Sequence, residues 1–460
     1  MIKRTLKQVQ EMAAGLNDIT SFQSMGIQGV TIDSRTVTEG CLFIPLKGGQ
    51  VDGHQYVKQA LADGAAASFW QKDVPNPPTD LPLIFVENTE KALQELARSY
   101  RTQLNIKVVG ITGSNGKTTT KDMTAALLAT TYKVHKTSGN FNNHLGLPLT
   151  VLSMEEDTEA AVLEMGMSSR GEIEFLSKMA KPEVAIITNI GESHLLDLGS
   201  REEIANAKLE IVEGLAKEGV LIYHGDEPLL RNRIKKDFLD LNVLSFGRTE
   251  QNDLFPQLIT QGADSTSFTI ACDGTEAEYE IPVLGHHNVL NALAAILAAK
   301  KLGVGDSSIR KGLSAIQLTN MRMELVEGAK GQKIINDAYN ASPTSVKAAI
   351  ELIEGLSGFE NKILVLGDML ELGPQEKDFH LKIGELISSE RIDKIFTYGP
   401  LAEFIAQGAS KAFSSERVQA FHDKQKLIAE LKSTTQANDI ILVKASRGMK
   451  LEEVVQALQK

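Results

Sequence analysis

The chain has 460 residues, 42% hydrophobic and 23% charged, a composition typical of a globular protein too long for a single core. Its net charge of -11 argues against a nucleic-acid or anionic-membrane surface. The longest apolar helical run, 292–299, is too short to span a bilayer. The first residues lack the apolar core of a signal peptide, and Cys41 and Cys272 show no metal-binding spacing. We therefore expect a cytoplasmic protein with two free thiols.

Residues 1–104 are expected to form a first α/β unit, with strands at 30–35 and 41–46. Asp52-Gly53-His54 opens a helix that has Asp52 near its N-cap. Ser34, Arg35 and His54 would gather at one edge of a small sheet. Ordinary turn chemistry explains these residues at least as well, so their pattern alone leaves the choice open.

The second unit, 105–317, begins with a strand, a glycine loop and a helix. Gly113 and Gly116 permit a loop whose backbone N–H groups can face an anion, while Lys117 adds a positive charge and the Thr118 hydroxyl can hold Mg²⁺. The spacing departs from the usual P-loop, because Ile111 stands where the first glycine should be. A tight strand–helix turn is the alternative, but both flanks favour a phosphate-binding loop.

Further polar residues follow the expected strands of this unit, at 160–164, 184–188 and 219–223. Ligands of open α/β sheets gather beyond the carboxyl ends of strands. Glu164, Asn189 with His194 nearby, Lys208, and the pair Asn288 and Asn291 at the start of an alanine-rich helix are therefore candidates for binding a nucleotide and Mg²⁺. Each also has an ordinary explanation taken singly: a strand-end carboxylate, a loop histidine, a solvated lysine, or helix capping.

The third unit, 318–460, again alternates strands and helices, with strands at 334–337, 363–368, 394–398 and 440–444. Two of these strands end in aspartate, at the edge where ligands bind. A loop at 338–343 follows the first of them. The chain has no Gly-x-Gly-x-x-Gly fingerprint, so a dinucleotide is not implied.

Together these motifs resemble the Mur ligase family over essentially the whole chain. The specific signs are Thr112-Gly113-Ser114-Asn115-Gly116-Lys117-Thr118, Glu164, 188–194, Lys208, His287-Asn288 with Asn291, Arg322 and Asp337. Three stretches narrow the match within the family: 139–143, 337–343 and 444–449. One small departure is Asn336 before Asp337 and Ala338 after it, where the family often has Asp and Ser.

The resemblance implies an α/β protein of three domains: a small UDP-binding domain at 1–104, a central P-loop domain that binds ATP at 105–317, and a Rossmann-like domain at 318–460. It also implies a ligase reaction. ATP phosphorylates the terminal carboxylate of a UDP-N-acetylmuramoyl tripeptide, and the amine of D-alanyl-D-alanine attacks the acyl phosphate. The products are a peptidoglycan precursor, ADP and phosphate. A monomer that binds no nucleic acid and makes no stable membrane association is expected.

The resemblance also implies roles for individual residues. Lys117, Lys208, His194 and Glu164 are the implied catalytic residues. One Mg²⁺ would be held by Thr118 and Glu164, and a second by His194 and a carbamylated Lys208. ATP would be bound by Thr112, Gly113, Ser114, Asn115, Gly116, Lys117, Thr118, Thr119, Asn288, Asn291, Arg322 and Asp337. The other substrates would be bound by Ser34, Arg35, Asp52, Gly53 and His54 at the uridine diphosphate end, by Asn140, Asn142 and Asn143 facing the peptide, and by Tyr339, Asn340, Ser446 and Arg447. An unmodified Lys208 that pairs with Glu210 or a phosphate is the alternative to the carbamate.

Other readings fit less well. A GTPase switch needs Asn-Lys-x-Asp, but Asn361-Lys362 is followed by Ile363-Leu364. A P-loop motor leaves the two flanking domains without a role. The tripeptide-forming Mur ligase and folylpolyglutamate synthetase are the nearest alternatives. The diaminopimelate-adding form of that ligase has an Asp-Asn-Pro-Arg motif, which is absent here.

Overall fold

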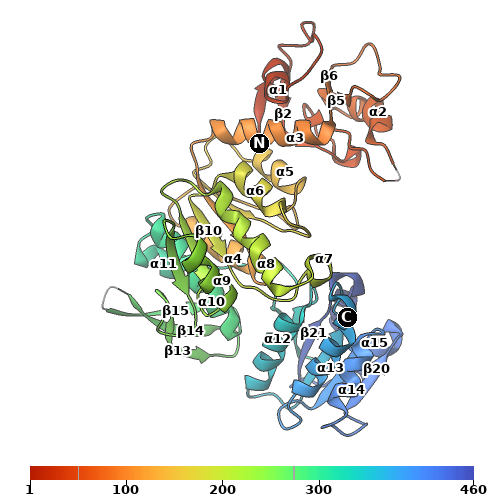
Figure 1. Cartoon of the computed structure of the whole chain (residues 1–460). Coiled ribbons are helices and arrows are strands. Elements are labelled where there is room, and N and C mark those ends of the chain that lie inside the picture. The colour runs from red at the N-terminus through yellow and green to blue at the C-terminus, as the bar shows by residue number, and fades with distance from the viewer. Residues whose placement is uncertain (50, 273–274) are drawn as a thin grey trace.

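The computed structural model describes residues 1–49, 51–272 and 275–460. Within these ranges the strands form five sheets, two of them six-stranded. Figure 1 shows the N-terminal part at one end, the first six-stranded sheet in the middle and the C-terminal part at the other end, so the order along the chain is also the order in space. The expected three-domain α/β architecture is confirmed. In the described ranges no helix has the length and apolar character needed to cross a membrane.

The N-terminal part is built on a parallel sheet of order β3-β4-β5-β6, beside a short antiparallel pair of β1 and β2. Its elements are β1 (Lys3–Thr5), α1 (Leu6–Met12), β2 (Gly26–Gln28), β3 (Val30–Thr31), η1 (Ser34–Thr36), β4 (Leu42–Phe43), η2 (Gly53–Tyr56), α2 (Val57–Ala62), β5 (Ala67–Gln71), β6 (Leu83–Val86) and α3 (Thr89–Gln103), where η marks a 3₁₀ turn.

Three expected elements of this part differ from the prediction, and one of them is the strand expected at 41–46, which is reduced to Leu42–Phe43. The first strand ends after two residues, because the Asp33 side chain accepts the backbone N–H of Arg35 at 3.0 Å and starts a 3₁₀ turn. The helix expected from Asp52 also begins as a 3₁₀ turn, in which Asp52 accepts the backbone N–H of His54 at 3.0 Å. Side chains that hydrogen-bond their own backbone in this way favour turns over strands and helices.

Helix α3 joins the N-terminal sheet to the central sheet. One continuous cluster of buried hydrophobic residues runs from the N-terminal strands through Leu93 and Leu96 of α3 to the helices beneath the central sheet. Ile2, one residue before β1, adds a backbone hydrogen bond from its N–H to the Leu152 carbonyl, at 2.8 Å. The N-terminal part is therefore packed on the central sheet rather than tethered to it.

The central sheet is entirely parallel, in the order β12-β11-β10-β7-β9-β8. Its middle strands are buried on both faces, which is why they read as continuous apolar runs. The elements are β7 (Lys107–Thr112), α4 (Lys117–Leu128), β8 (Val134–Lys136), α5 (Gly146–Leu152), β9 (Ala160–Glu164), α6 (Glu172–Ala180), β10 (Val184–Ile187), α7 (Leu195–Leu198), α8 (Arg201–Leu209), η3 (Glu210–Gly214), β11 (Val220–His224), α9 (Pro228–Asp237), β12 (Asn242–Phe246), α10 (His286–Lys301) and α11 (Asp306–Ser314).

The expected strand–helix alternation of this part was incomplete. Between β12 and α10 lies an antiparallel sheet of three strands, β13 (Pro256–Gln261), β14 (Thr266–Cys272) and β15 (Thr275–Ile281). Phe268 and Ile270 of β14 point into the core that α10 shares with the central sheet. In β14 these apolar residues alternate with polar ones, a pattern typical of an antiparallel strand with one face in solvent. The other strands were found by a different pattern, a continuous apolar run.

The C-terminal sheet has the order β16-β17-β21-β18-β19-β20, parallel except for the edge strand β16. All four strands expected here are present, with ends within one residue of the predicted ones. The elements are β16 (Glu324–Glu327), β17 (Lys333–Asp337), α12 (Pro343–Gly355), β18 (Lys362–Gly367), η4 (Gly373–Gln375), α13 (Glu376–Leu386), β19 (Lys394–Tyr398), α14 (Ala402–Ala409), β20 (Val418–Phe421), α15 (Lys424–Thr434), β21 (Ile440–Lys444), η5 (Arg447–Met449) and α16 (Glu452–Leu458).

Candidate active site

The glycine loop between β7 and α4 has the geometry of a phosphate cradle. Gly113 has φ of +148°, and a Cβ there would lie 1.8 Å from Oγ1 of Thr188. Gly116, with φ of +79°, directly precedes α4, and a Cβ there would lie 2.6 Å from Oδ1 of Asn291. Only glycine fits these positions, and the N-terminus of a 12-residue helix then faces the loop.

Lys117 lies at the start of this helix with its amine turned back over the loop. Its Nζ donates to the Gly113 carbonyl at 2.8 Å. Burial lowers the pKa of Lys117, and the carboxylate of Glu164 opposes that shift. Among the described residues, no carboxylate forms a direct ion pair with this amine, so a phosphate in the cradle would be its natural anionic partner.

Glu164 stands at the carboxyl end of β9, as expected, and is buried. Its Oε2 accepts the Thr118 hydroxyl at 2.9 Å, and its Oε1 accepts Nδ2 of Asn142 at 2.8 Å. A hydroxyl and a carboxylate this close are a suitable pair of oxygen donors for Mg²⁺. Asn142 was predicted to face the peptide, but its side chain is directed instead to this carboxylate.

His194 and Lys208 follow on the next elements of the central sheet. Burial, with Lys117 and Lys208 nearby, lowers the pKa of His194 to about 4, so its ring is neutral and able to bind a cation. The Lys208 side chain is about 1% exposed, and burial, together with Lys117, lowers its pKa well below the usual value. In the described ranges its amine makes no hydrogen bond or ion pair. Glu210, the alternative partner, binds Arg170 and the Gly171 N–H instead.

The oxygen and nitrogen donors of Thr118, Glu164 and His194 are suitable ligands for Mg²⁺. Within the described residues, however, no group of three His, Cys, Asp or Glu side chains forms a metal site. Thr118 and Glu164 give the first predicted cation one anionic ligand, but His194 alone gives the second predicted cation none. A carbamate on Lys208 would supply one. The buried, unpaired amine is therefore the feature that the predicted chemistry requires.

The pocket beyond the cradle extends along the start of α10. Both predicted asparagines line it: Nδ2 of Asn291 donates to Oδ1 of Asn288 at 3.2 Å, and Oδ1 of Asn291 accepts the Thr120 hydroxyl at 3.3 Å. The candidate Asn189 lines the pocket as well. The pocket also has lining residues that were absent from the predicted site, namely Thr188, His224, His287, Leu290, Met323, Thr344, Ser345, Ala348 and Lys444. The signals that could have found some of them are the position of His224 at the end of β11, of Lys444 at the end of β21, and of His287 beside Asn288.

Arg322 reaches this pocket from the linker that leads to the C-terminal sheet. Its Nη2 donates to Oγ1 of Thr118 at 3.3 Å, and its guanidinium lies 4.0 Å from the centre of the Tyr339 ring. Its neighbours Met321 and Met323 both have left-handed backbones, with φ of +60° and +53°. Strained residues of this kind persist only where the surrounding contacts hold them. The linker is therefore folded to present the arginine to the P-loop.

Asp337, at the end of β17, also lines the pocket and is buried. Its Oδ2 pairs with Nζ of Lys444, which also donates to the Asn340 carbonyl at 3.0 Å. Its Oδ1 accepts the Met323 N–H at 3.3 Å. Residues from both six-stranded sheets thus meet at one pocket, as the sequence predicted for Arg322 and Asp337.

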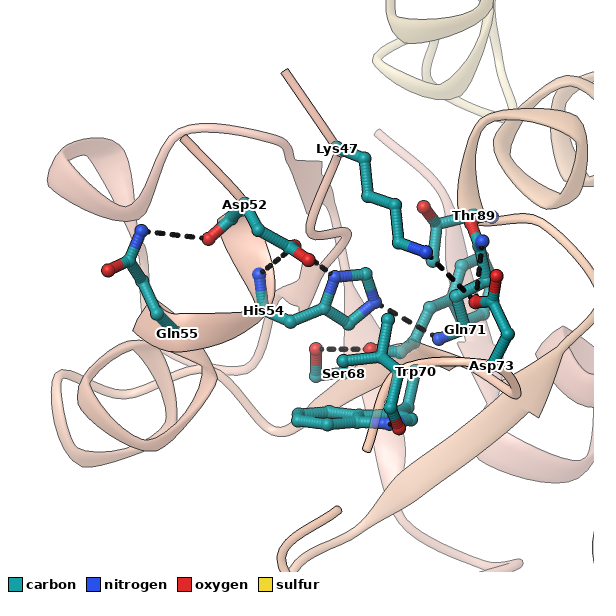
Figure 2. A network of polar contacts seen from close by, with 11 residues as sticks. Lys47, Asp52, His54, Gln55, Ser68, Trp70, Gln71, Asp73 and Thr89 are labelled. Atoms are coloured by element: carbon teal, nitrogen blue, oxygen red, sulfur yellow. Dashed lines mark hydrogen bonds and ion pairs between the residues drawn. The ribbon is translucent and has the colours of Figure 1, made fainter. Parts of the chain in front are cut away.

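The predicted uridine diphosphate end lies at the carboxyl ends of β3 and β4, where Ser34, Arg35, Asp52 and Gly53 are partly or fully exposed. Figure 2 shows that His54 is different. Its ring is buried, Nε2 accepts the Gln71 backbone N–H at 3.0 Å, and Nδ1 lies 2.6 Å from Oδ1 of Asp52. With both nitrogens engaged, His54 holds Asp52 in place and has no free ring nitrogen for a ligand.

Of the remaining predicted substrate residues, some have side chains that bond within the protein and others have side chains that are open to a ligand. Asn143 accepts the Gly146 N–H at 2.8 Å and so caps α5, while Asn140 is exposed. Ser446 is buried and accepts the Leu370 N–H at 2.9 Å. Four side chains of this set remain at least partly open to a ligand. They are Asn140, Asn340, which lines the pocket, Tyr339, which is half-buried beside the guanidinium groups of Arg322 and Arg447, and Arg447, which is exposed and pairs with Glu452.

Comparison with known families matches each of the three parts of the chain. The Mur ligase family, catalytic domain, matches residues 26–101; the Mur ligase middle domain matches 111–299; and the Mur ligase, glutamate ligase domain, matches 321–447. The chain belongs to the Mur ligase family.

Curated relatives specify the class further. The UDP-N-acetylmuramoyl-tripeptide–D-alanyl-D-alanine ligase of Bacillus subtilis is 53% identical over 100% of this chain and 99% of its own. The ligase of the same name from Escherichia coli is 33% identical with the same coverage. Among solved structures, MurF from Acinetobacter baumannii has a TM-score of 0.89 at 30% identity, covering 100% of this chain and 99% of its own. MurF from Thermotoga maritima in complex with ADP has a TM-score of 0.82 at 30% identity, covering 96% and 98%.

Proposed function

We propose that this Mur ligase joins D-alanyl-D-alanine to a UDP-N-acetylmuramoyl tripeptide at the expense of ATP. The observation that carries the proposal is the pocket in which Arg322, on the linker to the C-terminal sheet, contacts Thr118 of the P-loop. A nucleotide in that pocket would contact two domains at once. An enzyme with three substrates needs such a contact, because it must bring together groups that are bound on different domains. Relatives that match the whole chain and carry this activity in their names support the choice of substrates.

The reaction proceeds in two steps. The γ-phosphoryl group of ATP moves to a terminal carboxylate oxygen of the tripeptide, which leaves ADP and an acyl phosphate. The amine of D-alanyl-D-alanine then attacks the acyl carbon, loses a proton, and expels phosphate from the tetrahedral intermediate. The product is a UDP-linked pentapeptide, the precursor of peptidoglycan.

The P-loop residues 112–119 bind the phosphates, and Lys117 offsets the charge that grows on the transferring oxygens. Arg322 adds a second positive charge from the opposite side. Asn288 and Asn291 bind the adenine, and Asp337 binds the ribose. Thr118 and Glu164 would hold one Mg²⁺, and His194 and a carbamylated Lys208 would hold a second. Bound there, the two ions would neutralise the phosphate and the carboxylate that must approach each other.

At the other end, we assign the uridine diphosphate to Ser34, Arg35, Asp52 and Gly53, with His54 acting through Asp52. The domain boundaries proposed are 104/105 and 317/318. The peptide and D-alanyl-D-alanine lie between Asn140 and the group Tyr339, Asn340 and Arg447, with Ser446 supporting the loop beside them.

The protein works as a monomer in the cytoplasm, without nucleic acid and without stable membrane association. The net charge of -11 supports the absence of nucleic-acid and membrane binding, since an acidic surface repels nucleic acid and anionic lipid.

The test is phosphate release in mixtures that each omit one component. ATP, UDP-N-acetylmuramoyl tripeptide and D-alanyl-D-alanine should all be required, with lysine-containing and diaminopimelate-containing tripeptides assayed in parallel. Turnover with a UDP-muramyl dipeptide and a free amino acid, but not with this mixture, would show that the protein catalyses the preceding step, the formation of the tripeptide.

A further inference from the structure

The loop that follows β10 is bonded directly to the glycine loop. The backbone N–H of Gly191 donates to Oγ of Ser114 at 2.9 Å, and the Ser193 hydroxyl donates to the Ser114 carbonyl at 3.4 Å. A Cβ on Gly191 would lie 3.1 Å from Asn115 and 3.5 Å from Oγ1 of Thr344. The absence of a side chain at 191 thus lets the glycine loop, this loop and the start of α12 converge.

Glu192, the next residue, crosses from the central domain to α12 of the C-terminal sheet. Its Oε2 accepts both the Thr344 hydroxyl, at 2.7 Å, and the Thr344 backbone N–H, at 3.3 Å. Beside it, the hydroxyl of Ser342, the N-cap of α12, donates to Oδ1 of Asn115 at 3.1 Å. The first turn of α12 is therefore held by one residue of the glycine loop and one residue of the loop bonded to it.

A carboxylate in this position has a physical reason to bind. The first N–H groups of a helix have no partner within the helix, and the helix dipole places partial positive charge there. Glu192 satisfies one of these groups from another domain and pairs its negative charge with that end of the helix. The same helix presents Thr344, Ser345 and Ala348 to the nucleotide pocket.

We propose that Glu192 is a positioning residue that docks the N-terminus of α12 on the glycine loop, and that it thereby couples nucleotide binding to the placement of the C-terminal domain. This proposal rests on the ATP-dependent function proposed above. Glu192 need not touch ATP. By fixing α12, it fixes the part of the pocket lined by Thr344, Ser345 and Ala348 and the sheet that carries Asp337.

A double-mutant cycle tests this coupling. Glu192→Ala and Thr344→Val should each lower kcat/KM for ATP by roughly tenfold, as for a charge-assisted hydrogen bond, and the double variant should be little worse than either single one. Glu202→Gln is the control, because it removes the same charge from an exposed residue of α8 and should leave kcat/KM unchanged. Single effects that multiply to about a hundredfold, or an unchanged Glu192→Ala enzyme, would overturn the proposal.

Domain placement is measured separately by small-angle scattering of the full chain. The wild type should contract when ADP and the UDP-linked tripeptide bind, and Glu192→Ala should contract less at saturating ligand. Equal contraction of the two proteins would contradict the docking role. If Glu192→Ala fails to fold, Glu192→Gln, which keeps an oxygen acceptor but loses the charge, and Thr344→Val carry the same comparison.

These measurements separate the two proposals. A wild-type protein that releases no phosphate with the full substrate mixture would refute the ligase function. A wild type that turns over normally, with Glu192 variants that turn over and contract equally well, would refute the docking role alone.

Discussion

Replacing Lys208 with methionine should abolish activity and yet make the protein more stable. The Lys208 side chain is about 1% exposed, and in the described ranges its amine makes no hydrogen bond or ion pair. Methionine has a similar length and fills the same space without an ionisable group. The substitution therefore removes the cost of burying an amine and breaks no hydrogen bond.

The size and sign of the gain follow from the pKa. Burial, with Lys117 nearby, lowers the pKa of Lys208 well below its usual value of 10.5. At pH values between the lowered pKa and 10.5, the unfolded chain binds more protons than the folded protein. The cost of burying Lys208 is therefore absent above about pH 10.5 and grows as the pH falls. At pH 7 the ceiling is about 5 kcal/mol, because pH 7 lies about 3.5 units below the unfolded pKa and each unit is worth about 1.4 kcal/mol. Relaxation and water penetration reduce such penalties, so we expect about 2–3 kcal/mol.

The assay is amide hydrogen exchange of α8, with thermal unfolding, between pH 6 and pH 10 in buffer free of CO₂. Lys217→Met, at an exposed lysine, is the matched control and should show no pH-dependent gain. A Lys208→Met protein that is less stable than the wild type throughout, or a gain that does not shrink as the pH rises, would refute the reasoning.

The same lysine carries the carbamate prediction. A neutral amine adds to CO₂ and releases a proton, which converts Lys208 to an anionic ligand, and a nearby cation would stabilise that charge. Protein supplied with ¹³C-bicarbonate and Mg²⁺ should show a carbamate signal by NMR that Lys208→Met lacks. Lys208→Ala should lose nearly all activity, and formate or acetate should partly restore it. Near-normal activity of Lys208→Arg would mean that the site needs a positive charge.

Three other substitutions have expected outcomes. Gly113→Ala should abolish ADP binding by calorimetry, because an added Cβ would lie 1.8 Å from the Thr188 hydroxyl, whereas Gly26→Ala, with nothing within 4 Å, should bind normally. Arg322→Lys should lower kcat/KM for ATP by roughly tenfold or more without changing the Tm of the ligand-free protein. The reason is that lysine cannot stack on the Tyr339 ring while reaching the P-loop. An unchanged kcat/KM would contradict this. Burial lowers the pKa of His287 from 6.5 to about 4, so the wild-type protein loses stability as the pH falls from 6.5 to 4. In urea unfolding, the loss of stability between pH 7 and pH 4.5 should be about 2–3 kcal/mol smaller for His287→Phe than for the wild type.

Much of the fold could be predicted from the sequence because its signals are local. A buried parallel strand is a continuous apolar run, and a P-loop is a strand, a spaced pair of glycines and a helix. The four C-terminal strands and the loop around Gly113 and Gly116 were found in this way. The antiparallel strands from 256 to 281 were missed, because their alternating pattern was not the one sought.

By itself, the sequence supplied the candidate residues for the chemistry: a lysine after a glycine loop, a strand-end carboxylate, and an arginine just beyond the second domain. Only the tertiary structure decided what those residues face. Arg322 meets Thr118 although 204 positions separate them in the chain. His54 turns inward to Asp52, and Lys208 is enclosed with no anionic partner among the residues that the structure describes. Residue type and spacing specify which groups are available, but burial and partners depend on how distant segments pack, and it is burial and partners that set the charge and reach of each group.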